Sequence, residues 1–550
     1  MTLMILALLA CGSPDGPEPK KRNLDAPVYE LTDDPYTVLQ GVWEPKIPPQ
    51  ETVEAIEAGT FGVSDIDQYE AYGLGIEWAP GVPWVEHDEL APGFVEGTDR
   101  RSVAWIWQAA DPQIIDEESP IRFEAYDGLY RPGGHLTVQA FEAHVRTAQR
   151  LNERSSRRYD FAVIAGDLTD GSHLNEMQWF MTSLNGGRLD PDSGADDDPV
   201  PGEGNDFNDP FLSDGLDADW YVALGNHETL YNGGFGQLDD ATRDAAVGTE
   251  IYEFPLFKNG FRDGAAVDAP VVAAGSTVAD ESRLPLRLPE ILEMIYRSPG
   301  SPKGHGLTWD DVENQRGYFS VQPIEGMPVR LIVLNTVDSD ALIGVGAQGY
   351  VDEEQHDWLI AELAASDEDG ELVIIMTHHR LKDIGSFSPT QGDDLAATMA
   401  ACDGLALVIT GHGHFNQKGM EGPDPGTGMG FWQLMLASTV DFPMQTRLIE
   451  VVDERNGFAT IYVTNLDHNS PTDSLAHRSR ALAAGKMAFP NVVGDMADIE
   501  GFWEGELEAQ NLILRIELPQ KVQDTLARYE WSTVIESEET LLALPSPDVQ

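Results

Sequence analysis

The chain has 550 residues, too many for one small core, and predicts one large domain with appended segments or two domains. It contains 94 Asp and Glu residues against 34 Lys and Arg residues, which gives a formal net charge of -60. Because binding to nucleic acid or anionic lipid depends on Lys and Arg, this balance argues against a protein that works through a basic face.

The N-terminus carries an apolar run, Leu3–Ala10, that leads directly to Cys11. This stretch resembles a bacterial lipoprotein signal in which Leu8-Leu9-Ala10-Cys11 is the lipobox. The resemblance implies a signal over residues 1–11, lipid on Cys11 and anchoring in the cell envelope, at the bacterial outer membrane or facing the periplasm. The alternative is an unprocessed N-terminus with a chance cysteine. No other run approaches the roughly 18 apolar residues of a membrane span, so the lipid is the only expected membrane attachment.

Composition divides the rest of the chain. Residues 12–35 are charged and Pro-rich, and predict a flexible tether. Residues 36–100 carry several Trp residues among many Gly and Pro residues, and predict an irregular but ordered N-terminal extension. Residues 101–468 carry the regular pattern of a main domain, and 469–550 are expected to form a C-terminal appendage. Cys402 is expected to be a small buried apolar residue.

Short apolar runs with β-branched residues recur from residue 101 and predict buried strands. Segments with helical spacing lie between several of them, so the alternation predicts an α/β fold. The predicted strands are Val103–Ala110, Phe161–Ala165, Trp220–Leu224, Val329–Leu334, Leu372–Thr377, Leu405–Thr410, Phe431–Ala437, Thr446–Val452 and Ala459–Thr464, the last two joined by a hairpin turn at Asn456-Gly457. The predicted helices are Val138–Arg154, Glu176–Leu184, Asp352–Ala365 and Asp394–Ala401.

Residues 185–219 interrupt this alternation with a segment rich in Asp, Gly and Pro. We expect a long solvated acidic loop. A calcium site is the alternative, because carboxylates and backbone oxygens suit Ca²⁺, although the spacing matches no EF-hand.

Polar side chains follow five of the predicted strands at the point where each strand ends. They are Asp111-Pro112-Gln113, Gly166-Asp167-Leu168-Thr169-Asp170, Gly225-Asn226-His227-Glu228, His378-His379 and Gly411-His412-Gly413-His414. In open α/β sheets, ligands bind outside the carboxyl ends of the strands. Imidazole, carboxylate and amide groups together suit two divalent cations, and one Asp can bridge a pair about 3.5–4 Å apart. The preceding glycines permit sharp turns and close backbone approach.

This ordered series, D-x-x, G-D-x-x-D, G-N-H-E, H-H and G-H-x-H, resembles the calcineurin-like metallophosphoesterase superfamily over roughly residues 101–468. The resemblance implies an α/β fold of two facing mixed β-sheets flanked by helices, in four layers. It implies that Asp111 and His414 hold a first metal and that Asp167 bridges to a second. Asn226, His378 and His412 would hold the second metal, with His379 as the alternative to His378.

The resemblance also implies a catalytic His227, which lies near the leaving-group oxygen and is oriented by the following acid, Glu228. A general acid of this kind is typically worth ~10²–10⁴ in rate. Asp170 is expected to cap the helix or turn that follows its strand rather than to bind metal.

One position departs from the superfamily pattern. The first motif is D-x-H in most relatives, whereas Gln113 stands here in place of the His. An amide oxygen can bind metal but is neutral and harder than imidazole, so we expect a weaker or differently selective first site among Mn, Fe, Zn and Mg, with Mn or Mg favoured over tightly held Fe. A bacterial subset of the superfamily shares Asp-Pro-Gln, and Glu118-Ser119-Pro120 and Asp441-Phe442-Pro443 are similar to it.

The expected function is hydrolysis of a small-molecule phosphate mono- or diester by metal-activated water, without a covalent intermediate. An anionic ester has to approach an acidic protein, so we expect the metals and Arg residues such as Arg131 or Arg380 to make the mouth of the site neutral or positive. The alternative is a non-catalytic, degenerate metal-binding surface lipoprotein, with Gln113 as a first step of decay. A nuclease is disfavoured by the net charge of -60, and no nucleic-acid or protein partner is predicted.

Overall fold

The computed structural model describes residues 35–122, 131–230, 239–250, 277–338, 347–421, 430–489 and 508–529, apart from 156, 196, 197, 199 and 203, together with the short pieces 233–234, 541 and 544. The apolar N-terminal run, Cys11 and nearly all of the tether lie outside these described residues, so the lipoprotein signal stays a prediction. None of the helices in the described part of the chain combines the length and apolarity that a bilayer crossing needs.

The larger of two main sheets has seven strands. They are β3 (Val85–Leu90), β4 (Arg101–Ala109), β5 (Phe161–Ala165), β8 (Trp220–Ala223), β15 (Gln445–Asp453), β16 (Phe458–Asp467) and β17 (Leu512–Glu517), in the spatial order β3-β17-β16-β15-β4-β5-β8. The strands β4, β5 and β8 run parallel, whereas β15 and β16 form the antiparallel hairpin predicted at Asn456-Gly457. At the turn, Gly457 has a φ of 103°, which glycine adopts without a side-chain clash.

The smaller main sheet has six strands. They are β9 (Phe319–Val321), β10 (Val329–Val333), β11 (Leu372–Met376), β12 (Leu405–Thr410), β13 (Gln417–Glu421) and β14 (Phe431–Met435), in the order β13-β14-β12-β11-β10-β9. The four central strands are parallel and the two outer strands are antiparallel to their neighbours. The strands predicted from apolar runs are therefore confirmed, with ends displaced by a few residues at most.

Alternating side chains of the smaller sheet pack into two different cores, as the period of a strand requires. Ile374 and Met376 of β11 join the large core that both sheets share. Val373 and Ile375 point to the opposite face and pack with Leu359 of a covering helix. Cys402 lies in this second core, which confirms the prediction of a buried apolar role.

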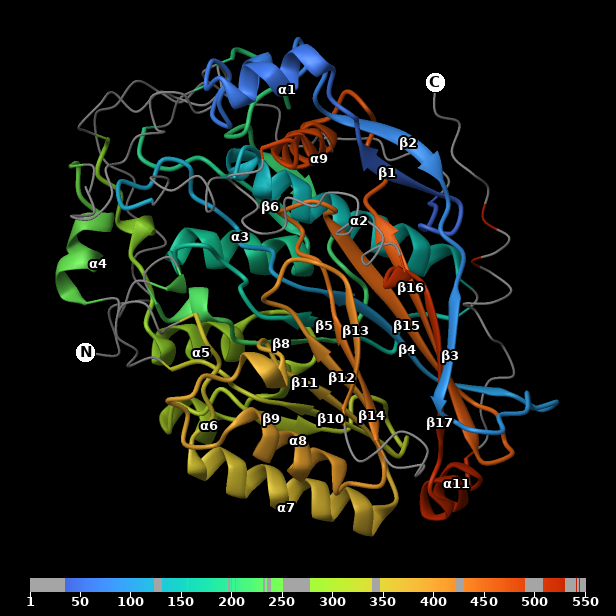
Figure 1. The fold of residues 1–550 in the computed structure, drawn as a ribbon. Helices are drawn as coiled ribbons and strands as arrows, with labels where there is room; N and C mark the ends of the chain where they lie inside the picture. Colours follow the sequence, from blue (N-terminus) through green and yellow to red (C-terminus); the bar gives the residue numbers. More distant parts are fainter. Residues whose placement is uncertain are drawn as a thin grey trace.

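Helices cover the outer faces of the two sheets (Figure 1). The helices α2 (Thr137–Arg154) and α3 (Leu174–Asn185) lie against the larger sheet, and α7 (Glu353–Asp369) and α8 (Gly392–Ala400) lie against the smaller one. The predicted fold class, two facing mixed sheets flanked by helices, is confirmed. The other elements with described bounds are β1 (Gly41–Pro45), β2 (Ile76–Pro80), β6 (Gly187–Leu189), β7 (Phe211–Ser213), α1 (Gln50–Glu57), α4 (Asp240–Ala246), α5 (Leu288–Arg297), α6 (Trp309–Glu313), α9 (Leu475–Lys486) and α11 (Gln520–Leu526).

The N-terminal extension, 36–100, and the C-terminal appendage, 469–550, each add a strand to the larger sheet. Strand β17 pairs antiparallel with β16 and parallel with β3, so both segments extend the larger sheet. Leu512 and Leu514 of β17 are fully buried, and the partner strands remove the exposed edge that β16 would otherwise present. Helix α9 packs against α2 and brings Lys486 toward the polar residues described below.

The acidic segment 185–219 also differs from the expectation of a solvated loop. Its strands β6 and β7 pair, Asp206 is wholly buried and Asp209 is 3% exposed. Carboxylate oxygens of Asp198, Asp206 and Asp209 lie within 4.8 Å of one another. Burial raises the pKa of Asp206 to about 6, and the charges of Asp209 and Asp198 act in the same direction. Asp206 and Asp209 are therefore packed into the domain, whereas Asp198 is more exposed.

Candidate metal centre

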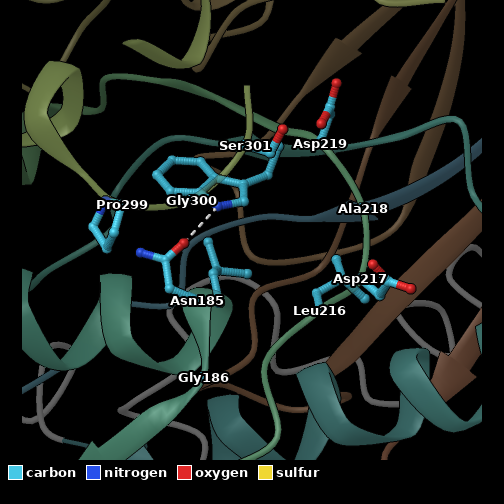
Figure 2. Close-up of a pocket in the computed structure, with 11 residues that line it drawn as sticks. Asn185, Gly186, Leu216, Asp217, Ala218, Asp219, Pro299, Gly300 and Ser301 are labelled. Carbon is cyan, nitrogen blue, oxygen red and sulfur yellow. Dashed lines mark hydrogen bonds between the residues drawn. The ribbon is translucent and has the colours of Figure 1, made fainter. Parts of the chain in front are cut away.

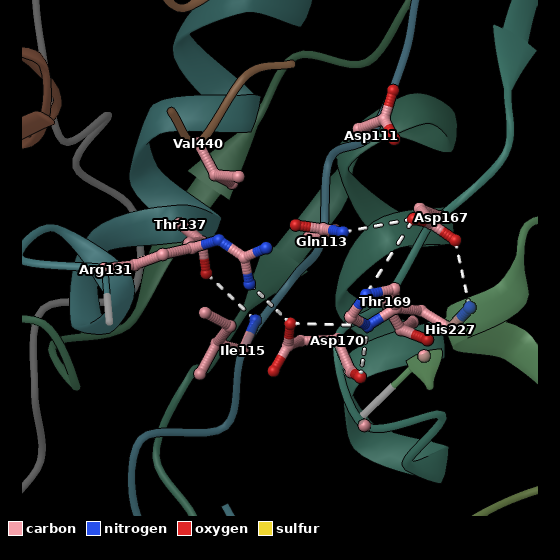
Figure 3. A network of polar contacts seen from close by, with 12 residues as sticks. Asp111, Gln113, Ile115, Arg131, Thr137, Asp167, Thr169, Asp170, His227 and Val440 are labelled. Carbon is pink, nitrogen blue, oxygen red and sulfur yellow. Dashed lines mark hydrogen bonds and ion pairs between the residues drawn. The ribbon is translucent and has the colours of Figure 1, made fainter. Parts of the chain in front are cut away.

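The five polar strand ends meet where the carboxyl ends of both sheets come together. The larger sheet supplies Asp111 and Gln113 after β4, Asp167 after β5, and Asn226 and His227 after β8. The smaller sheet supplies His378 after β11, and His412 and His414 after β12. Figure 3 shows Asp111, Gln113, Asp167 and His227 gathered beside one another. The structure thus brings together every residue that the sequence nominated for metal binding.

The backbone at this point is unusual. Five of the nominated positions, none of them glycine, have positive φ: Asp111 (48°), Gln113 (37°), Asp167 (50°), His412 (73°) and His414 (59°). Such conformations are uncommon for residues with a Cβ atom, cost on the order of 1–3 kcal/mol each, and gather at functional sites. The strained backbone directs these side chains toward one place.

Glycines before the ligand positions allow the close approach that the sequence predicted. A Cβ atom on Gly225 would lie 2.1 Å from the Asp167 Oδ1 atom, and one on Gly411 would lie 2.6 Å from the Asp111 Oδ2 atom. At Gly166, where φ is +88°, a Cβ atom would lie 2.5 Å from the His378 Nδ1 atom. Larger residues at these three positions would collide with the candidate ligands.

The first cluster contains Asp111, Asp167 and His414, whose ligand atoms lie within 4.8 Å of one another. The His414 Nδ1 atom is 2.8 Å from a carboxylate oxygen of Asp441, so this nitrogen carries the proton and donates it. The other ring nitrogen, Nε2, lies 3.4 Å from the Asp111 Oδ1 atom. Burial lowers the pKa of His414, but Asp111 and Asp441 more than offset burial and raise it to about 9.

The second cluster is centred on Asn226. Its Oδ1 atom is 3.1 Å from both the His378 Nε2 atom and the His412 Nδ1 atom. His378 donates through Nδ1 to the carbonyl of Ala165 at 2.7 Å, so Nε2 is the nitrogen left to bind. That nitrogen is also 3.3 Å from the Asp167 Oδ2 atom, which places Asp167 between the two clusters.

The two adjacent histidines occupy different positions. His378 Nε2 faces Asn226 and Asp167, whereas the His379 Nδ1 atom contacts the Thr336 hydroxyl at 2.8 Å. His379 also lies close enough to His378 and His412 to offer a ligand atom within 4.8 Å. The contacts to the shared carboxylate favour His378 as the ligand.

Gln113 lies inside the first cluster. Its Nε2 atom is 3.1 Å from the Asp167 Oδ2 atom, and its Oε1 atom is buried without a hydrogen-bond partner among the described residues. Leaving an acceptor unsatisfied costs about 1–3 kcal/mol, a cost that a cation would remove. The donor set therefore fits a metal at this position, with Gln113 as a neutral ligand.

The side chain of His227 is 13% exposed and borders the shared carboxylate. Its backbone N–H donates to the Asp167 Oδ1 atom at 2.9 Å, and its Nε2 atom is 3.9 Å from Asp167 Oδ2. Its Nδ1 atom donates to the carbonyl of Asp170 at 2.8 Å and lies 3.4 Å from the Asp170 carboxylate. These contacts fix the ring so that Nε2 faces the two clusters of candidate ligands.

The orienting role expected of Glu228 belongs to Asp170 in the structure. Glu228 is wholly buried, and its carboxylate accepts hydrogen bonds from the backbone N–H groups of Gly225 at 2.8 Å and Thr169 at 3.1 Å. It ties the loops after β5 and β8 together. Burial and the charge of Asp167 raise its pKa to about 8. Asp170 was expected to cap the helix or turn that follows β5. His173 holds the N-cap position of α3, and the Asp170 carboxylate contacts Arg131 and His227.

The arginines expected at the mouth of the site are both engaged by carboxylates. Arg131 contacts Asp170 at 2.6 Å and Asp441 at 3.3 Å, whereas Arg380 forms an ion pair with Asp383. The positive charge of each of these two arginines is therefore compensated by carboxylates. Sequence reasoning expected Arg131 at the mouth but missed its pairing with Asp170 and Asp441. The only signal for Asp441 was the Asp441-Phe442-Pro443 motif.

Removing divalent cations is expected to lower the thermal unfolding midpoint of the protein. A ligand that binds only the folded state adds about 2.7 kcal/mol per site at 100 times its Kd, and here it also relieves repulsion between Asp111 and Asp167. Calorimetry on the chelated protein, with and without added Mn²⁺, measures the difference. An Asp167→Asn variant provides the control, since its midpoint should respond little to Mn²⁺. Equal midpoints for chelated and Mn²⁺-loaded wild type would contradict a metal centre.

A separate pocket of about 330 Å³ lies at the opposite, amino-terminal end of β8 (Figure 2). It is lined by Leu184–Gly186, Leu216–Trp220 and Pro299–Ser301, and the Trp220 indole donates to the Asn185 side chain at 3.1 Å. It holds none of the candidate ligands, so the chemistry belongs to the clusters at the other end of the strand.

Comparison with known protein families gives an extensive match. The profile of the calcineurin-like phosphoesterase family matches residues 105–416, more than half of the chain, and the matched range contains every candidate ligand and His227. Among solved structures, a dimetal phosphatase from Danio rerio is similar at 11% identity, over 67% of this chain and 99% of that chain. The TM-score of 0.37 is too low to show a shared fold by itself. No curated protein matches the chain.

Proposed function

The chain belongs to the calcineurin-like phosphoesterase family, and from this premise we propose that it hydrolyses a phosphate mono- or diester at a two-metal site. The proposed substrate is a small anionic ester, because the net charge of -60 disfavours nucleic acid.

The observation that carries the proposal is the convergence of acceptor atoms. His378 and His414 each donate through Nδ1 to an oxygen. In the neutral form of each histidine, the Nε2 atom is therefore unprotonated, and it faces a carboxylate. Asn226 adds an amide oxygen 3.1 Å from two imidazole nitrogens. With the histidines neutral, acceptors face acceptors in both clusters, an arrangement that bound cations would stabilise, and the two clusters share Asp167.

Different side chains would hold each of the two cations. The first cluster would hold one cation through Asp111, His414, Gln113 and the shared Asp167, and the second would hold another through Asn226, His378 and His412. When bound, two such cations supply Lewis-acid stabilisation of the phosphoryl group and lower the pKa of the attacking water.

His227 is proposed to deliver the proton that the leaving oxygen needs. Its Nδ1 atom is occupied by the carbonyl of Asp170, so only Nε2 can donate to a substrate. That atom lies 3.9 Å from the carboxylate of Asp167 that the two clusters share. Asp170 positions the ring through its backbone carbonyl.

The proposed location is the cell envelope, through lipid on Cys11. The support is the lipobox-like sequence Leu8-Leu9-Ala10-Cys11.

The test is hydrolysis of an aryl phosphate and of the matching aryl diester by chelated protein with graded Mn²⁺, Zn²⁺ or Mg²⁺. We expect turnover only with added metal, and the ratio of the two rates assigns the enzyme as a mono- or diesterase. Metal uptake without turnover of either ester would favour the non-catalytic metal-binding alternative. The absence of metal uptake would contradict the two-metal site.

A further inference from the structure

Asp441 lies directly behind a candidate ligand of the first metal. One of its carboxylate oxygens, Oδ2, accepts the hydrogen bond from the His414 Nδ1 atom at 2.8 Å. The residue belongs to the loop between β14 and β15, and its side chain is only 20% exposed. The imidazole of His414 therefore stands between Asp441 on one side and Asp111, 3.4 Å from Nε2, on the other.

Two cations hold the Asp441 carboxylate in place. The Lys486 ammonium of α9 lies 3.1 Å from Oδ1, and the Arg131 guanidinium lies 3.3 Å from Oδ2. Burial raises the pKa of Asp441, but Lys486, His414 and Arg131 more than offset burial and hold it well below its usual value. Asp441 is an anion with a fixed orientation.

A carboxylate in this position acts on the metal through the histidine. By accepting from Nδ1 it fixes the tautomer and the angle of the ring, and it makes Nε2 a stronger donor to a cation. The first cluster has particular need of this effect, because Gln113 contributes a neutral amide where an imidazole would bind more strongly. Only one imidazole, that of His414, remains in the first cluster, against two in the second.

We propose that Asp441 is a positioning residue for the first metal, which it controls by orienting and polarising His414. The proposal rests on the two-metal site proposed above. Arg131 links this support to the other side of the centre, because it also contacts the Asp170 carboxylate at 2.6 Å, beside His227 (Figure 3).

A purely structural role is the alternative explanation for Asp441, since its ion pair with Lys486 ties α9 to the loop. The Lys486→Met variant separates the two roles. It removes that ion pair while leaving the hydrogen bond to His414 and the contact with Arg131. A structural role predicts the same loss of metal affinity as in Asp441→Ala, and a positioning role predicts a clearly smaller loss.

The experiment is calorimetric titration of the full chelated chain with Mn²⁺. We expect two equivalents for the wild type and for Lys486→Met. For Asp441→Ala we expect one equivalent unchanged and the other weakened by about 10–100-fold. Asp441→Asn keeps the shape and an acceptor oxygen but loses the charge, so its affinity for the weakened equivalent should lie between those of the wild type and Asp441→Ala. This variant also controls for misfolding of Asp441→Ala.

Two results would overturn the proposal. One is wild-type affinity for both equivalents in Asp441→Ala and Asp441→Asn. The other is an equal loss in Lys486→Met. A wild type that binds no Mn²⁺ would overturn the two-metal site itself, and Asp441 with it, so failure of the underlying function is recognised before any variant is compared.

Discussion

Asp167→Asn is expected to reduce hydrolysis by at least about 10³-fold, because the change removes charge from both halves of the centre at once. The Asp167 carboxylate lies 3.3 Å from His378 in the second cluster and 3.1 Å from Gln113 in the first. Its buried charge would be shared by two cations. The Asp167 carboxylate belongs to the first cluster and also lies within 3.3 Å of a histidine nitrogen of the second cluster. The amide keeps the shape and one oxygen, so the loss reports charge rather than volume.

The measurement combines metal analysis of the purified variant with steady-state rates at saturating Mn²⁺. We expect less than two equivalents of metal and no recovery of the rate when Mn²⁺ is raised. Asp453→Asn is the matched control, since Asp453 is a buried carboxylate (4% exposed) that accepts from the backbone of Arg455, at the far end of β15 from the site. If Asp167→Asn binds two equivalents of metal and hydrolyses the ester at the wild-type rate, Asp167 does not bridge the two metals.

His227→Asn is expected to lower kcat by ~10²–10⁴ while leaving both metals bound. The residue touches Asp167 through its backbone N–H, which the substitution retains, so the metal clusters lose no ligand. What disappears is the proton that Nε2 supplies to the leaving oxygen.

Aryl esters with leaving groups of graded basicity separate this role from a general disturbance. Esters whose leaving group is a weakly basic phenol need no proton, so the variant should hydrolyse them at close to the wild-type rate. Its rate should fall furthest below the wild-type rate on esters of basic alcohols. Asp170→Asn should show a milder form of the same trend, because the carbonyl that accepts from His227 is part of the backbone. A uniform loss across the series would argue that His227 is not the proton donor.

The central strands and the candidate ligands were predictable from the sequence because both depend on local pattern. The run Leu405–Thr410 is continuous, apolar and β-branched, and the polar residues that follow it, His412 and His414, could only emerge at the end of a buried strand. The same holds for Asp167 after β5. In each case the element and the polar residue beside it are close in the chain.

The errors concern partners that lie far apart in the chain. Glu228 follows His227 directly, yet Asp170, 57 positions away, contacts the imidazole. Arg131 reaches Asp441 across 310 positions, a pairing that no local period can reveal. The place of β17 in the larger sheet was not predicted for the same reason, since its alternating burial is typical of a strand but does not identify the neighbouring strands.

The division of the ligands between the two sheets also sets when the centre can form during synthesis. Asp111, Asp167 and Asn226 all leave the ribosome before residue 230, but every histidine ligand lies after residue 377. The nascent chain therefore carries an acidic half-site that lacks its imidazoles until about 150 further residues have emerged, at translation rates of roughly 5–20 residues per second. We therefore expect the complete set of candidate ligands to form late, after the second sheet docks on the first.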